Sequence, residues 1–270
     1  MFAPMPRLTL PDGTEIAYVT RGQGERPLLL VHGHLASKEW WEPTLTALPA
    51  ACTAYALDLP GSGESPETGR RHTIDYFAEV VAAFARAVGV TRAAVVGHSM
   101  GGGVAQMLAL EHPALVERLV LLDAMAADGF HVLFFQGPTL ARRLMAQPAL
   151  LARALRAVMP RCQDEALMER LVAASSRASE QVFLEQPLTM HEANWFDRLG
   201  EIRCPTLFLH GELDDFVPRA GSERTAAAIP GCRFELLEGC GHSPQVEAPD
   251  LFHAKLLGFL DLAPRGQSGV

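Results

Sequence analysis

The sequence predicts an α/β fold: a mostly parallel, doubly wound sheet with an N-terminal antiparallel hairpin and a helical cap insertion. Short apolar runs bounded by turn residues recur along the chain and alternate with segments of helical periodicity. One long interval in the second half breaks this alternation, because its pattern is helical throughout. Strands that are separated by helices are expected to pair in parallel, with helices on both faces of the sheet.

The predicted strands begin with an antiparallel hairpin, formed by residues 8–10 and 16–19 around the turn at residues 11–13, which reads Pro-Asp-Gly. Six further apolar runs are each four residues long, as expected for buried and mostly parallel strands. They are residues 28–31, 54–57, 93–96, 119–122, 206–209 and 234–237.

The clearest predicted helix follows the second of these six runs, where apolar residues recur on one helical face from Ile74 to Val88. Thr73 is its expected N-cap and Gly89 its expected end. We also expect helices over residues 40–48 and 246–262, and a helix after residue 99 that stops at His112 and Pro113.

Residues 127–200 are expected to form the helical cap, and residues 1–126 and 201–270 the sheet-containing core. An insertion after the strand that ends before Asp123 would cover the carboxyl edge of the sheet, where ligands bind in folds of this kind. Each aromatic residue of the cap is expected to pack against the body, and some of them together to line an apolar pocket. These aromatic residues are Phe130, Phe134, Phe135, Phe183 and Trp195.

Composition argues against several classes of function. The net charge of −8 disfavours a nucleic-acid-binding protein. No apolar run approaches the roughly 20 residues that cross a bilayer, and residues 1–7 do not resemble a secretory signal, so a cytoplasmic protein without a membrane partner is expected. The five cysteines lack C-x-x-C spacing and are expected to be reduced thiols. His32 and His34 have no companion cluster with ligand spacing, so we predict neither metal nor cofactor.

The motif G-x-S-x-G at residues 97–101 directly follows an apolar run and precedes a helical pattern. In such a sharp strand-to-helix turn, glycine is needed where a side chain would collide with the strand or the helix. Ser99 is therefore the candidate nucleophile. The backbone N–H of Met100, at the positive end of the helix dipole, is a candidate donor to an oxyanion.

A serine nucleophile needs a base within hydrogen-bond reach and an acid to orient that base. His242 lies in a glycine-rich turn after the last predicted strand, which suits a base at a strand's carboxyl end. Acidic residues follow the strand at 206–209, within residues 211–218, and one of them is expected to orient His242.

These motifs resemble the α/β-hydrolase family, in the order serine, acid, histidine and over nearly the full length of the chain. The segments that carry the resemblance are residues 32–33 (His-Gly), 58–63 (Asp-Leu-Pro-Gly-Ser-Gly), 97–101, 211–218 and 241–242. The resemblance implies Asp214 as the acid, with Asp215 or Asp123 as substitutes. It also implies the backbone N–H of His34 as the second oxyanion donor.

The resulting expectation is a serine hydrolase, most simply a carboxylesterase, that cleaves small or medium apolar esters through an acyl-enzyme. Lactones and thioesters are alternative substrates, and hydrolysis of a carbon–carbon bond in a diketone acid is the competing reaction. A ligand receptor on the same fold is the alternative that is not an enzyme. The sequence gives no oligomeric state.

Overall fold

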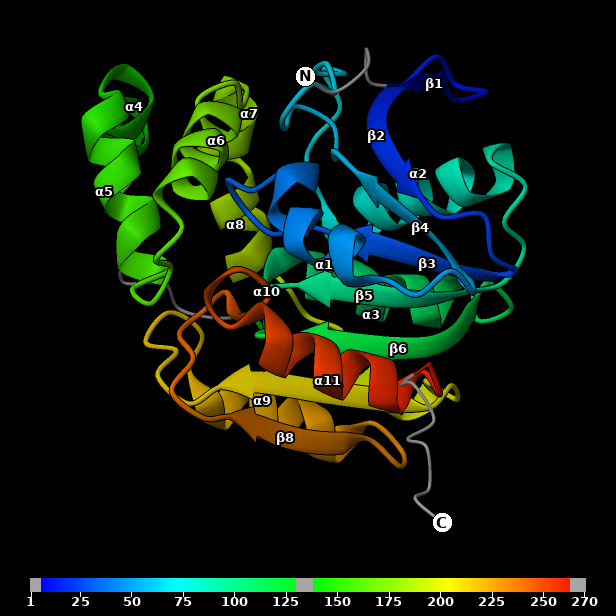
Figure 1. Ribbon diagram of the computed structural model, residues 1–270. Helices are drawn as coiled ribbons and strands as arrows, with labels where there is room; N and C mark the ends of the chain where they lie inside the picture. The colour runs from blue at the N-terminus through cyan, green and yellow to red at the C-terminus, as the bar shows by residue number, and fades with distance from the viewer. Residues whose placement is uncertain (1–5, 130–137, 263–270) are drawn as a thin grey trace.

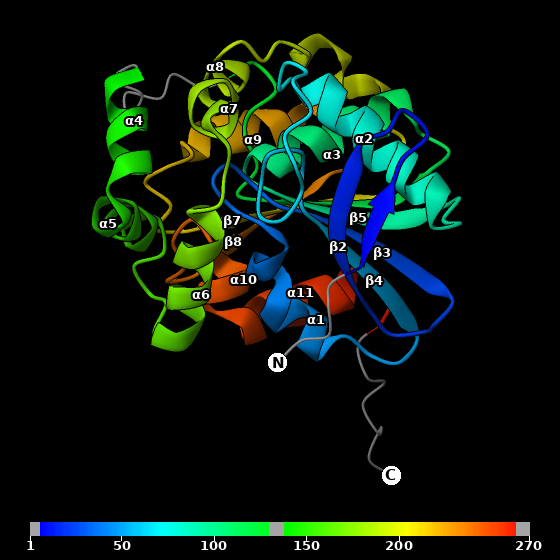
Figure 2. The same ribbon diagram turned by 90° about the horizontal axis from the view of Figure 1, so that it is seen from above.

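The computed structural model describes residues 6–129 and 138–262. One eight-stranded sheet runs through the molecule in the order β1-β2-β4-β3-β5-β6-β7-β8 (Figures 1 and 2). The strands are β1 (Arg7–Thr9), β2 (Glu15–Arg21), β3 (Arg26–Val31), β4 (Cys52–Leu57), β5 (Ala93–His98), β6 (Val116–Leu122), β7 (Thr206–Gly211) and β8 (Arg233–Leu237).

Pairing in the sheet confirms the predicted fold class. Strands β1 and β2 form the N-terminal hairpin, with Leu8 opposite Ile16, and β2 continues antiparallel onto β4. Every other neighbouring pair is parallel. The six predicted apolar runs all lie in strands, although most strands extend further, because backbone pairing continues past the apolar residues; Arg26, for example, pairs with Cys52.

Helices cover both faces of the sheet, with α2, α3 and α9 on one face and α1 and α11 on the other (Figure 1). Successive strand residues point to opposite faces, so Leu28 and Leu30 pack with α1 and α11 while Leu29 and Val31 pack on the other side. The helices of the body are α1 (Glu42–Ala47), α2 (Ile74–Ala87), α3 (Met100–Glu111), α9 (Arg219–Ala228), α10 (Pro244–Glu247) and α11 (Pro249–Phe259).

Two helix predictions need correction at their boundaries. Residues 38–41 form a 3₁₀ helix and α1 begins only at Glu42, where Pro43 occupies the first turn. The helix predicted over 246–262 is two helices separated at Ala248, whose φ of −143° and ψ of 61° are not helical. A residue that precedes proline is disfavoured in the helical conformation, and Pro249 follows Ala248. The Thr73 N-cap of α2 is confirmed, since its side chain accepts from the Tyr76 N–H.

A run of helices connects β6 to β7 and lies beyond the carboxyl edge of the sheet (Figures 1 and 2). They are α4 (Pro138–Ala146), α5 (Pro148–Val158), α6 (Glu165–Ser175), α7 (Glu180–Leu184) and α8 (Gln186–His191). Their apolar side chains, Phe183 among them, form a cluster with Leu35 and Trp40 of the body. Trp195 instead packs into the core on the α2 and α3 face. Phe130, Phe134 and Phe135 lie outside the described residues.

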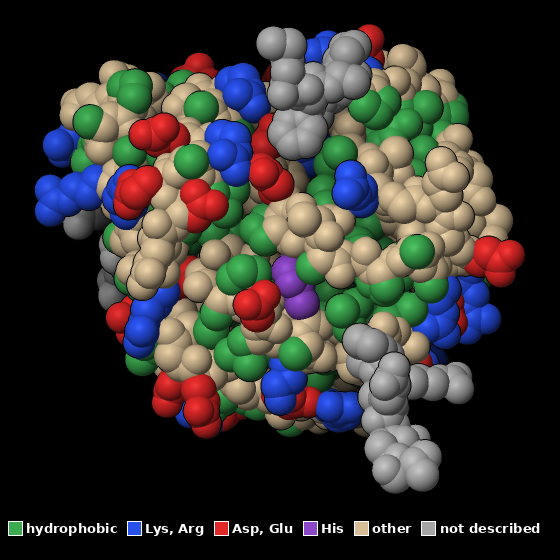
Figure 3. All heavy atoms as spheres, viewed as in Figure 1, with side chains coloured by type: hydrophobic (Ala, Val, Ile, Leu, Met, Phe, Trp, Pro, Cys, Tyr) green, Lys and Arg blue, Asp and Glu red, His purple; other side chains and the backbone are tan. Residues whose placement is uncertain are grey.

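Charged side chains of both signs are interspersed on the face of the molecule seen in Figure 3. Some pair across elements, as Arg170 of α6 does with Glu42 of α1. Within residues 6–129 and 138–262, no helix is both long and apolar enough to cross a membrane. All five cysteines fall in these ranges and none is in a disulfide.

A buried ion pair joins the loop after β3 to the loop after β4. Lys38 and Asp58 are 1% and 0% exposed, and the Lys38 ammonium donates to the Asp58 carboxylate at 2.7 Å. The same carboxylate accepts the backbone N–H groups of Lys38 and Glu64. Burial raises the pKa of Asp58 to about 6 against the opposing effect of Lys38, so this carboxyl is ionised at neutral pH.

Replacing Lys38 with Met keeps the length of the side chain and removes its charge, which leaves Asp58 buried without its cation. We expect the free energy of unfolding to fall by about 3–5 kcal/mol, measured by urea denaturation. The control is Arg219→Met, because Arg219 pairs with Glu223 on the surface and its loss is expected to cost less than about 1 kcal/mol. Equal effects of the two variants would contradict this view of the buried pair.

Candidate active site

The candidate site residues follow different strands but lie at one edge of the sheet, because parallel strands end on the same side. Ser99 follows β5, Asp214 follows β7 and His242 follows β8. Strands β3 and β5 are neighbours although β4 lies between them in sequence, so the chain reverses its direction of winding there. Ligands bind at such a switch point in open α/β sheets.

Ser99 occupies a strained turn between β5 and α3, with φ of 54° and ψ of −120°. Close approach of the flanking elements explains the two glycines of the motif. A Cβ on Gly97 would lie 2.2 Å from the Gly101 carbonyl oxygen, and a Cβ on Gly101 would lie 2.4 Å from the carbonyl oxygens of Val31 and His32. Only glycine fits at either position without moving backbone.

Ser99, His242 and Asp214 form a continuous hydrogen-bonded chain. The Ser99 hydroxyl lies 3.0 Å from Nε2 of His242, and Nδ1 of His242 lies 2.8 Å from Oδ2 of Asp214. All three residues are buried. Asp215, which the sequence left as a substitute acid, is exposed instead. With Nδ1 protonated toward Asp214, Nε2 of His242 is free to accept the serine proton.

Asp214 is arranged to remain ionised beside His242. Its Oδ1 accepts the backbone N–H groups of Phe216 and Val217, at 2.8 and 3.0 Å. Burial opposes ionisation, but His242 and these two N–H groups outweigh it and lower the pKa of Asp214 to about 2. The carboxylate is therefore charged across the neutral pH range, as an orienting acid must be.

The imidazole of His242 is enclosed by two rings, since the ring centroids of His98 and Phe216 lie 4.9 and 4.8 Å from its own. His98 also contacts the loop after β8 directly, because its Nε2 lies 2.8 Å from the His242 carbonyl oxygen. Burial lowers the pKa of His98 to about 3, so the neutral ring donates this hydrogen bond. His98 therefore connects the turn at Ser99 to a residue 144 positions further along the chain.

The loop after β3 lies directly against the candidate nucleophile, because a Cβ on Gly33 would be 2.8 Å from Cβ of Ser99. His32 stabilises this loop, because its Nδ1 lies 2.8 Å from the Gly33 carbonyl oxygen and its Nε2 accepts from the Leu59 N–H. Met100 is the first residue of α3, so its N–H has no acceptor within the helix. Of the two expected oxyanion donors, Met100 follows Ser99 in the chain, and His34 follows Gly33, which lies against Ser99.

Two residues that sequence reasoning missed connect this edge of the sheet to the helices between β6 and β7. The Oε1 atom of Gln186, in α8, lies 2.9 Å from Nδ1 of His34. Glu247 of α10 accepts from the N–H of Ser243, next to His242, and from the N–H of Arg161. Glu247 lies five residues after His242 between two prolines, but no sequence motif marked it.

Metal-ligating side chains come together at one place in the described part of the chain. Ligand atoms of Asp123, His210 and Asp214 all lie within 4.8 Å of one another, and all three residues are buried. Asp214 is already hydrogen-bonded to His242. Asp123, which the family resemblance implied as a substitute acid, lies next to Asp214.

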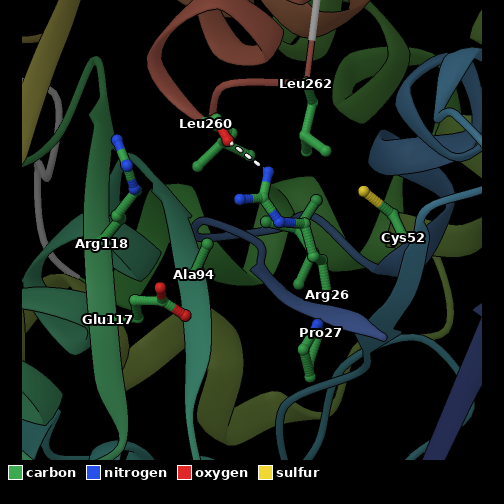
Figure 4. Close-up of a pocket in the computed structure, with 9 residues that line it drawn as sticks. Arg26, Pro27, Cys52, Ala94, Glu117, Arg118, Leu260 and Leu262 are labelled. Atoms are coloured by element: carbon green, nitrogen blue, oxygen red, sulfur yellow. Dashed lines mark hydrogen bonds between the residues drawn. The ribbon is translucent and has the colours of Figure 1, made fainter. Parts of the chain in front are cut away.

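A hollow at the amino ends of the strands is lined by residues of β3 to β6 and the end of α11 (Figure 4). It lies at the opposite edge of the sheet from Ser99, because the strands are parallel. Arg26 donates to the carbonyl of Leu260, and Arg118 donates to that of Phe259. These arginines donate to carbonyl groups at the C-terminal end of α11 and so attach that end of the helix to the sheet.

The sequence matches the model of the alpha/beta hydrolase family over residues 28–255. The chain belongs to this family. A non-heme haloperoxidase of Rhodococcus erythropolis is 29% identical over 95% of this chain and 100% of its own length. A 2-hydroxy-6-oxononadienedioate/2-hydroxy-6-oxononatrienedioate hydrolase of Paraburkholderia phymatum is 30% identical over 93% of each chain. The solved structure of a thermophilic esterase from Thermogutta terrifontis is 25% identical, with a TM-score of 0.83 over 96% of this chain and 98% of that one.

The family's turn at Ser99 depends on Gly101, so we expect Gly101→Ala to push the backbone of residues 31–32 away from α3. Thermal melting should show that the free energy of unfolding falls by about 1–3 kcal/mol, the usual effect of overpacking. The matched control is Gly258→Ala in α11, where an added Cβ has nothing within 4 Å and the melting temperature should stay equal or rise. Equal melting temperatures for Gly101→Ala and the control would contradict the close approach of α3 to the backbone of residues 31–32.

Proposed function

We propose that this alpha/beta hydrolase is a serine esterase that cleaves carboxylic esters of small or medium apolar substrates through an acyl-enzyme. The observation that carries the proposal is the hydrogen-bonded chain Ser99–His242–Asp214, with distances of 3.0 and 2.8 Å. Nucleophile, base and orienting acid in this geometry suit acyl transfer. The apolar cluster of the helices that lie over this edge favours an apolar substrate.

In the proposed mechanism, Ser99 attacks the ester carbonyl while Nε2 of His242 takes the hydroxyl proton. The imidazolium that forms is stabilised by Asp214, whose ionised state follows from its low pKa. The N–H groups of Met100 and His34 bind the oxyanion, and each such donor is worth about 3–4 kcal/mol of transition-state stabilisation. His242 then gives its proton to the leaving alcohol and activates water to release the acid.

Ser99→Ala removes the nucleophile, so hydrolysis of p-nitrophenyl butyrate should fall by about 10⁴–10⁶-fold and labelling by a fluorophosphonate probe should disappear. Ser222→Ala is the matched control: its buried hydroxyl has no hydrogen-bond partner and it lies on α9, outside the proposed machinery. That variant should keep both activities. Turnover that survives in Ser99→Ala would remove Ser99 from the mechanism.

The substrate class is tested by comparing kcat/KM for p-nitrophenyl esters of increasing chain length, lactones, thioesters and a vinylogous diketone acid. We expect the short and medium esters to give the highest values. A diketone acid that is cleaved more than about tenfold faster than any ester would replace the proposal with carbon–carbon bond hydrolysis. Negligible turnover of the whole panel, together with a large ligand-induced rise in melting temperature, would favour a ligand receptor.

A further inference from the structure

A second carboxyl group lies behind the candidate triad and has no place in the mechanism described above. Asp123 follows β6, is 0% exposed and has φ of 42°, a conformation that aspartate and asparagine tolerate better than most residues. Its backbone N–H donates to Leu209, and its Oδ1 accepts the N–H of Gly211 at 2.7 Å. The side chain is thereby fixed between the ends of β6 and β7, within 4.8 Å of a carboxylate oxygen of Asp214.

The hydrogen-bond partners of the two carboxyl groups differ. Asp214 accepts two backbone N–H groups and the ring N–H of His242. Asp123 accepts one backbone N–H, and its Oδ2 is buried without any partner. A buried carboxylate oxygen without a donor is strongly unfavourable, whereas a protonated oxygen can itself donate.

Among the residues that the structure describes, no lysine or arginine side chain pairs with Asp123. His210 is the nearest basic side chain, with Nδ1 at 3.4 Å from Oδ1 of Asp123, but neither of its ring nitrogens makes a hydrogen bond. Burial lowers the pKa of His210, so its ring is neutral at neutral pH. Glu247 acts on Asp123 as a further acid, and His242 acts on Asp214. From α9, Arg219 and Glu223 both act on His210, and these two side chains pair with each other at the surface.

We propose that Asp123 is a neutral carboxylic acid that donates a hydrogen bond from Oδ2 to the Asp214 carboxylate and so positions the acid that orients His242. Two ionised carboxylates at this separation repel each other, and the proton resides on the group with fewer donors. Burial first, and then Asp214, raise the pKa of Asp123 well above its ordinary value, which agrees with this assignment. Asp123 acts through Asp214 and is a positioning residue rather than a catalytic one.

The direct test measures protonation and does not depend on activity. Infrared spectra of the native protein with ¹³C-labelled aspartate carboxyls, recorded at pH 8, should contain the isotope-shifted carbonyl band of a neutral carboxylic acid. At this pH Asp58, whose pKa is about 6, is ionised and does not contribute. The band should be absent from Asp123→Asn. A native spectrum without any such band would overturn the proposal.

The functional test rests on the proposed esterase activity and compares two variants that suit the backbone at position 123. Asp123→Asn keeps a neutral donor, so kcat/KM and the midpoint of its acid limb should stay within about threefold and about 0.3 pH units of native. Asp123→Gly removes the donor, so kcat should fall about tenfold with KM unchanged.

The acid limb separates this proposal from the alternative of an ionised Asp123. If Asp123 were charged, Asp123→Asn would remove a negative charge near His242 and lower the midpoint by about one pH unit. That shift would overturn the proposal, as would equal kcat values for Asp123→Asn and Asp123→Gly. Absence of esterase activity in the native protein would refute the proposed function alone, since the infrared band would still be present.

Discussion

Parallel strand pairing is the constraint on which this molecule depends. Because β3, β5, β6, β7 and β8 all run in one direction, the residues that follow them are delivered to one edge of the sheet. Backbone pairing between neighbouring strands fixes their ends relative to one another. Ser99 and His242 are 143 residues apart in sequence, yet their side chains approach within 3.0 Å.

Contacts made by residues outside the proposed triad also hold the loops at this edge of the sheet in place. His98 binds the carbonyl of His242, and Glu247 binds the N–H of the next residue, so the loop that carries His242 is held at two points. Glycines allow β5, α3 and the loop after β3 to approach more closely than any side chain would permit. A catalytic hydrogen bond that must be accurate to a few tenths of an ångström needs such support.

Titratable groups of the same type differ in their hydrogen-bond partners at this edge of the sheet. Asp214 and Asp123 are both buried aspartates a few ångströms apart, but N–H donors gather around the first and leave an oxygen of the second unpaired. Histidines differ in the same way: His32 and His98 have pKa values lowered to about 4 and about 3 by burial, which makes them fixed hydrogen-bonding groups. His242 alone among these histidines joins a serine to a carboxylate.

The sequence by itself determined the α/β class, the apolar centres of the strands, the helices that follow Thr73 and Ser99, and the choice of Ser99 and His242 as candidates. These features depend on residues that are close together in the sequence: apolar periodicity, helix caps such as Thr73, and glycines at a tight turn. The family resemblance implied Asp214 as the acid, and the structure pairs it rather than Asp215 with His242. The tertiary structure alone decided that His98 bonds to a distant carbonyl and that Asp123 lies next to Asp214. It also showed the helix break at Ala248, Gln186 beside His34, and Glu247 beneath the His242 loop. Such relations depend on which segments become neighbours in space, and residue spacing along a chain does not contain that information.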